Sequence, residues 1–137
     1  NIEYLQEYAQ TVVDQFDVRS GEGIFSNAGK LSGGNQQKLI VGREMVASPQ
    51  LLIAVQPTRG LDVGAIEYIH SQLVAHRDKG HAVLLVSFEL DEIFNLSDRI
   101  AVMHSGRIMD VVLPSETDEA TVGLMMTGIE AKGAGHE

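Results

Sequence analysis

The sequence contains no cysteine and is poor in positive charge. Without cysteine, the 137-residue chain has no disulfide framework and no thiolate metal site. Lys and Arg number 10 against 19 Asp and Glu, which gives a formal net charge of −9 at pH 7. This balance argues against a nucleic-acid backbone as a broad partner and against adhesion to anionic lipid. The simplest consequence of the acidity is solubility.

Long apolar runs are also missing. The two longest, Leu51–Val55 and Ala82–Val86, are too short to span a bilayer, so no transmembrane helix is predicted. Because 44% of the residues are hydrophobic, the chain can nevertheless form a core. Neither run alternates with polar residues, and each therefore predicts a strand buried on both faces of a parallel sheet.

The remaining pattern predicts an α/β fold with a mainly parallel sheet, flanking helices and a C-terminal β-hairpin. Glycine, serine and asparagine make 17–30 loop-like, and Ser105-Gly106 is a two-residue hairpin turn. The expected elements are helices over 2–16, 34–47, 63–80, 89–95 and 119–126, and strands over 51–55, 82–87, 99–104 and 107–112.

The segment Leu31–Lys38, which reads Leu-Ser-Gly-Gly-Asn-Gln-Gln-Lys, predicts an exposed helix start. Ser32 can cap this helix, while Gly33 and Gly34 let a ligand approach the free backbone N–H groups. The N-terminal end of a helix attracts anions, and phosphate is the usual one. An ordinary N-cap could have the same sequence, so the octapeptide alone leaves both interpretations open.

The residues after each apolar run are the next candidates, because ligands gather at the carboxyl ends of parallel strands. Residues 55–62 read Val-Gln-Pro-Thr-Arg-Gly-Leu-Asp, and residues 87–92 read Ser-Phe-Glu-Leu-Asp-Glu. In this order, the motifs resemble the C-terminal part of an ABC-transporter ATPase domain. The Asn-Gln-Gln-Lys ending of the octapeptide and the run 57–65 resemble, more specifically, the tandem ATPase subunits of ribose-type sugar importers and their nucleoside-importing relatives. The resemblance extends from about residue 2 to residue 128.

The resemblance implies a truncated P-loop NTPase (ABC ATPase) domain, from the second ATPase domain of such a subunit. Residues 1–50 would form its helical signature segment and 51–128 the C-terminal part of the ATPase core. The glycine-rich residues 129–137 are expected to be a disordered tail.

The family's ATP-contacting motifs can be carried over to this chain by position. The signature loop contacts the γ-phosphate of ATP held by the opposite ATPase domain, and the D-loop, here Leu61 and Asp62, crosses between the two domains. The signature-loop residues that would contact ATP in trans are Leu31, Ser32, Gly33, Gly34, Asn35 and Gln36.

Three positions depart from the family pattern, so no catalytic set is intact. Val55 stands where an aspartate orders Mg²⁺, and valine cannot bind a hydrated cation. Gln56 replaces the glutamate that polarises the attacking water, and its amide cannot serve as a general base. Phe88 replaces the histidine that senses the γ-phosphate. A single Glu-to-Gln change could be an engineered trap, but three changes favour a naturally degenerate site.

A phosphate loop for the chain's own nucleotide is not found. Gly23–Lys30 resembles one superficially, but it has five residues between its glycines, where the motif has four. Leu31 then follows where Ser or Thr would bind Mg²⁺. We therefore expect ATP and Mg²⁺ to act in the full-length subunit and neither to bind tightly to this chain. No metal site is predicted, and the five histidines are expected at the surface: His70, His76, His81, His104 and His136.

The primary hypothesis is an ATP-binding subunit fragment of a sugar or nucleoside importer, inactive by itself. Its expected partners are another ATPase domain and transmembrane permease subunits at the cytoplasmic face of the membrane, with no nucleic acid. A sheet that lacks the phosphate-loop strand should also expose an apolar edge or face, so self-association is expected. Two alternatives are a soluble ABC-type ATPase of DNA repair or translation and a non-catalytic α/β regulatory module that folds as a monomer.

Overall fold

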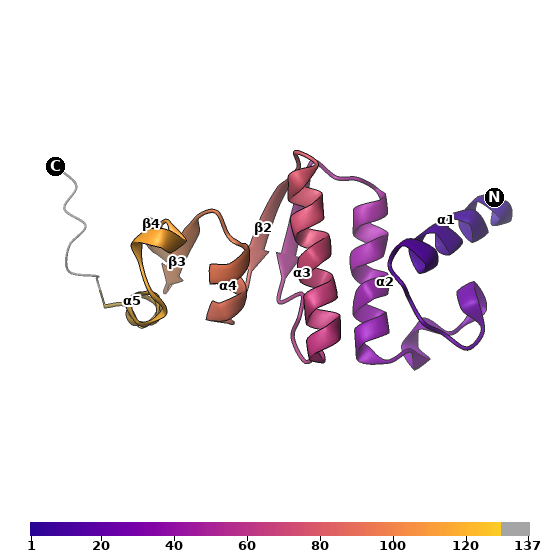
Figure 1. Cartoon of the computed structure of the whole chain (residues 1–137), viewed down its shortest axis with the longest axis horizontal. Helices are drawn as coiled ribbons and strands as arrows, with labels where there is room; N and C mark the ends of the chain where they lie inside the picture. Colours follow the sequence, from indigo (N-terminus) through magenta and orange to yellow (C-terminus); the bar gives the residue numbers. More distant parts are fainter. Residues whose placement is uncertain (130–137) are drawn as a thin grey trace. The chain divides into compact units, whose positions relative to one another are not determined.

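The computed structural model describes residues 1–129 (Figure 1). The chain forms two compact units, Asn1–Val86 and the part from Ser87 onward. Every predicted helix and strand is present, with its ends within two residues of the expected ones. The tail expected over 129–137 lies, from residue 130 on, outside the described residues. No helix in the described part of the chain is long and apolar enough to cross a membrane.

Two helices open the first unit and pack closely on each other. α1 (Ile2–Gln15) buries Val12 and is followed by the buried Phe16, and both side chains meet α2 (Gly33–Val46) at Gly42. A Cβ at Gly42 would lie 2.8 Å from the Phe16 ring and 2.9 Å from Val12. Only glycine therefore allows the two helices to approach this closely.

A two-stranded parallel sheet and one helix complete this unit. β1 (Leu51–Val55) pairs with β2 (Ala82–Val86) in a register that runs from Leu51 opposite Ala82 to Val55 opposite Val86. The crossover between them is α3 (Val63–Asp78), which contacts both α2 and β2 (Figure 1). Strand, helix, strand is the predicted parallel arrangement, and it is confirmed.

The expectation that both strands are buried on both faces is wrong. Along β1, Leu52 is 8% exposed, whereas its neighbour Ile53 is 60% exposed. Leu84 lies opposite Ile53 on β2 and is also exposed. One face of the sheet is covered and the other is open among the described residues, although the residues on both faces are apolar. An exposed apolar edge or face was expected from the sequence, because the sheet lacks the phosphate-loop strand, and the open face is apolar.

The second unit packs a helix on an antiparallel hairpin. β3 (Ile100–His104) and β4 (Arg107–Val112) are joined by the predicted two-residue turn, in which Ser105 and Gly106 both have positive φ angles of 47° and 77°. Two further helices are α4 (Leu90–Leu96) and α5 (Glu119–Met126). The core of the unit consists of Ile100, Val102, Val122 and Met125.

Candidate functional site

The N-terminal end of α2 is built around the hydroxyl of Ser32, as the sequence predicted. Ser32 is the N-cap, with extended backbone, and its Oγ accepts from the backbone N–H of Asn35 at 3.4 Å. The side-chain Nδ2 of Asn35 donates to the same Oγ at 2.9 Å. Gly33 has open space where a Cβ would stand. An exposed, capped helix end with a bare first turn can receive an anion.

The loop before this helix is held by a glutamine from the helix itself. Nε2 of Gln36 donates to the carbonyl of Leu31 at 2.8 Å and lies 3.5 Å from the carbonyl of Gly29. Because the side-chain amide of Gln36 bonds to backbone carbonyls that precede the helix, this side chain holds the loop in place.

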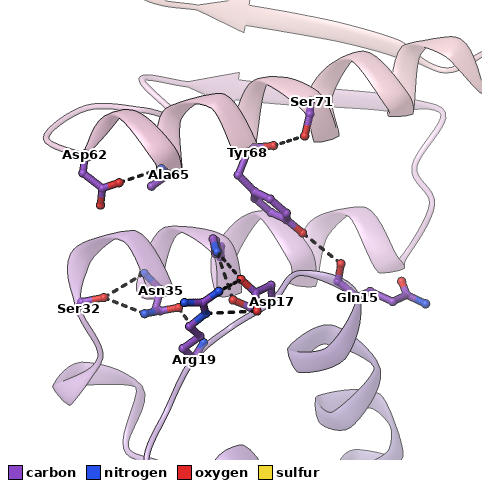
Figure 2. A network of polar contacts seen from close by, with 10 residues as sticks. Gln15, Asp17, Arg19, Ser32, Asn35, Asp62, Ala65, Tyr68 and Ser71 are labelled. Carbon is purple, nitrogen blue, oxygen red and sulfur yellow. Dashed lines mark hydrogen bonds and ion pairs between the residues drawn. The ribbon is translucent and has the colours of Figure 1, made fainter.

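The signature loop and the D-loop, predicted from separate motifs, come together in the first unit. Asp62 caps α3, since its Oδ1 accepts from the N–H of Ala65 at 2.9 Å. A Cβ on Gly34 would lie 3.3 Å from the Cβ of Ala65 and 3.7 Å from Oδ2 of Asp62. The N-terminal ends of α2 and α3 are thus neighbours (Figure 2). The N-terminus of α2 attracts negative charge, whereas that of α3 is already capped by the carboxylate of Asp62.

A polar network supports the base of the signature loop (Figure 2). Asp17, whose φ is +46°, accepts from Lys38 Nζ at its backbone carbonyl and at Oδ2, both at 3.2 Å. The same Nζ lies 4.6 Å from the centroid of the Tyr68 ring, a cation–π distance. Hydrogen bonds from Lys38, and then from Arg19, hold the pKa of the Asp17 carboxyl below its usual value. Sequence reasoning missed this network because it joins α2, α3 and the turn after α1.

Two of the three positions at which we expect a departure from the family pattern, Val55 and Gln56, lie at the end of β1. The N–H of Gln56 donates to the carbonyl of Val86 at 2.8 Å, and Gln56 adopts a positive φ of 49°. Its side-chain Nε2 is buried without a hydrogen-bond partner among the described residues. Val55 has no ligand atom to offer a metal. Phe88, the third departure, belongs to the second unit and is exposed.

The expectation that the histidines lie at the surface is wrong for His76. Its side chain is buried, its Nε2 lies 3.0 Å from the carbonyl of Pro49, and its ring is 4.4 Å from that of His81. Burial lowers the pKa of His76 below its ordinary value. The signal was available, since His76 follows Ile69 and Leu73 on the buried face of α3 at helical spacing. Within residues 1–129, no three His, Asp or Glu side chains gather as a metal site would require.

Comparisons with known proteins identify relatives of the chain. The chain is 57% identical over 127 residues to the guanosine import ATP-binding protein NupO of Bacillus subtilis and 55% identical over 124 residues to the nucleoside import ATP-binding protein NupA of Lactococcus lactis. These matches cover 93% and 90% of the chain but only 25% and 24% of the relatives. The chain therefore spans about a quarter of the length of the curated relatives it matches. No protein-family model matches it.

Solved structures give the same fold. A nucleotide-free ATP-binding cassette of an ABC transporter matches 81% of the chain and 43% of its own, with a TM-score of 0.70 and 25% identity. The ATP-binding subunit of another ABC transporter covers 89% of the chain and 54% of its own, with a TM-score of 0.74 and 19% identity. The chain is part of an ABC ATPase domain, a P-loop NTPase fold. Its relatives are, in particular, the ATP-binding proteins of nucleoside and sugar importers.

Proposed function

We propose that this chain is part of the second ATPase domain of an ABC importer for nucleosides or simple sugars. The support is the high identity to proteins named as guanosine and nucleoside import ATP-binding proteins, followed by a glucose import ATP-binding protein of Haloferax volcanii at 47%. Residues 1–50 are then the helical signature segment and 51–128 the C-terminal part of the ATPase core. The full-length subunit works at the cytoplasmic face of the membrane, attached to permease subunits.

The N-terminal end of α2 acts in trans in this proposal, on the γ-phosphate of ATP held by a partner ATPase domain. The observation that carries it is the capped, exposed start of α2, at which Ser32 and Gly33 leave room for a ligand and Gly34 lies against Asp62. A bacterial ABC transporter cassette of this fold, 21% identical with a TM-score of 0.69, has been solved as a dimer. A dimer is the assembly that a shared site requires.

The chain's own strand end does not fit Mg²⁺ or a hydrolytic site. Mg²⁺ prefers carboxylate and water oxygens, and Val55 provides neither. Gln56 cannot accept a proton at neutral pH, and Phe88 has no hydrogen bond to offer a phosphate. Phosphoryl transfer depends on electrostatics and positioning, so a chain without these three contacts cannot supply the catalytic groups of a hydrolytic site. In this proposal, the full-length subunit hydrolyses ATP, with Mg²⁺ as the cofactor, at the other composite site.

Replacement of Gln56 tests whether the end of β1 takes part in ATP hydrolysis. In the full-length subunit assembled with its permease, Gln56→Asn should leave steady-state ATP hydrolysis within about twofold, because no step depends on this amide. Asparagine tolerates the positive φ of this position, so the backbone is preserved. A loss of more than about tenfold, with an unchanged melting temperature, would mean that this strand end takes part in the reaction.

We also propose that the open apolar face of the sheet makes the 137-residue chain self-associate. Five exposed residues lie on this face: Leu51, Ile53 and Val55 of β1, and Leu84 and Val86 of β2. Ile53→Lys should therefore shift the chain toward monomer in sedimentation velocity, since a charge at the centre of the face cannot be buried in a contact. The control is Ile108→Lys, at an exposed site of the second unit. A chain that is already monomeric at high concentration would contradict the proposal.

A further inference from the structure

The side-chain amide of Asn35 connects the signature loop to the turn that follows α1. The backbone N–H of Arg19 donates to Oδ1 of Asn35 at 2.7 Å, and Nδ2 of Asn35 donates to Ser32 Oγ at 2.9 Å (Figure 2). A backbone N–H can only donate, so the atom that faces Arg19 must be the oxygen. The direction of the amide is therefore fixed by its partners, and its NH₂ group faces the serine.

This arrangement determines what the hydroxyl of Ser32 can do. A hydroxyl has two acceptor lone pairs and one hydrogen. Both hydrogen bonds to this side chain, from the backbone N–H and from Nδ2 of Asn35, end on Oγ as the acceptor. With its lone pairs turned toward the helix, the hydroxyl hydrogen is left to point away from it. Because Ser32 is exposed, that direction is open to a ligand.

The turn that carries Arg19, and so holds Asn35 in place, is itself fixed by contacts on its other side. Asp17, two residues before Arg19, receives two hydrogen bonds from Lys38, whose side chain is only 14% exposed. Tyr68 covers the Lys38 ammonium and donates its hydroxyl hydrogen to the carbonyl of Gln15 at 3.1 Å. The turn that offers the Arg19 N–H is thus fixed to both α2 and α3.

We propose that Asn35 is a positioning residue that keeps the Ser32 hydroxyl oriented as a donor toward a phosphate oxygen of the nucleotide. The inference rests on the proposed function, in which that nucleotide is held by a partner domain. A donor oriented in advance needs no reorganisation when charge develops on the γ-phosphate, and it stabilises the transition state more than the ground state. Loss of Asn35 should therefore lower kcat more than it raises KM.

A double-mutant cycle in the full-length subunit, assembled with its permease, tests this inference. Ser32→Ala should reduce kcat about a hundredfold, as removal of one oriented donor does. Asn35→Ala should reduce kcat about tenfold with KM within about twofold. If Asn35 acts through the serine hydroxyl, Asn35→Ala should cost less than about twofold in kcat when Ser32 is already alanine.

The outcomes separate the inference from the proposed function. An equal loss from Asn35→Ala in both backgrounds would assign it a structural role and overturn the inference alone. Hydrolysis unchanged by Ser32→Ala would overturn the inference and the proposed function together. Melting temperatures are measured for all four proteins, and if Asn35→Ala does not fold, the cycle is repeated with Asn35→Leu, which retains the volume of the side chain.

Discussion

Replacement of Ser32 by arginine in the full-length subunit should reduce ATP hydrolysis by at least about a hundredfold. The substitution removes the hydroxyl donor and fills the space beside Gly33 that the proposed phosphate must enter. It also removes the N-cap of α2, which costs about 1 kcal/mol of folding free energy and does not by itself stop an enzyme. The measurement is steady-state phosphate release by the subunit assembled with its permease.

The matched control for this prediction is Ser71→Arg. Ser71 is an exposed serine on α3 whose hydroxyl donates only within its own helix, to the carbonyl of Tyr68 at 2.6 Å. The same change there adds the same charge and bulk, and hydrolysis should stay within about twofold. If Ser32→Arg and Ser71→Arg hydrolyse ATP equally fast, the N-terminal end of α2 is not part of the site and the proposed function fails.

The largest stability effect is expected from Gly42→Leu. The first atom of any side chain at this position would already stand 2.8 Å from the Phe16 ring, and both Phe16 and Val12 are buried and cannot move into solvent. Overpacking of this kind costs about 3 kcal/mol, which exceeds the gain of less than about 1 kcal/mol in helix propensity. Urea denaturation of the 137-residue chain should show the loss as a lower midpoint.

Gly33→Leu is the control in the same helix. No atom lies within 4 Å of a Cβ at Gly33, so leucine meets open space there, and the free energy of unfolding should change by less than about 0.5 kcal/mol. Equal losses for the two variants would show that glycine matters in α2 through the backbone conformation rather than through the contact with α1. A stable Gly42→Leu protein would contradict the close packing of the two helices.

Local sequence signals were sufficient for the elements and for the caps. The periodicity of α1 and α3, the Ser105-Gly106 turn and the capping serine at position 32 depend on contacts within a few residues, and all were found as expected. The motifs also identified the ABC ATPase fold, because several segments had to agree in order and spacing. Burial was harder to predict. His76 was expected at the surface, although its neighbours on α3 already marked its face as buried.

The sequence by itself determined the parallel strand–helix–strand unit and the helix that Ser32 caps. Only the tertiary structure decided which apolar residues are covered, since Leu52 and Ile53 are both aliphatic neighbours on β1 but Leu52 is buried and Ile53 is exposed. It also decided that Gly34 meets Asp62 and that Asn35 joins Ser32 to Arg19. Such contacts join residues far apart in the chain or depend on how a side chain is turned, and no local pattern specifies them.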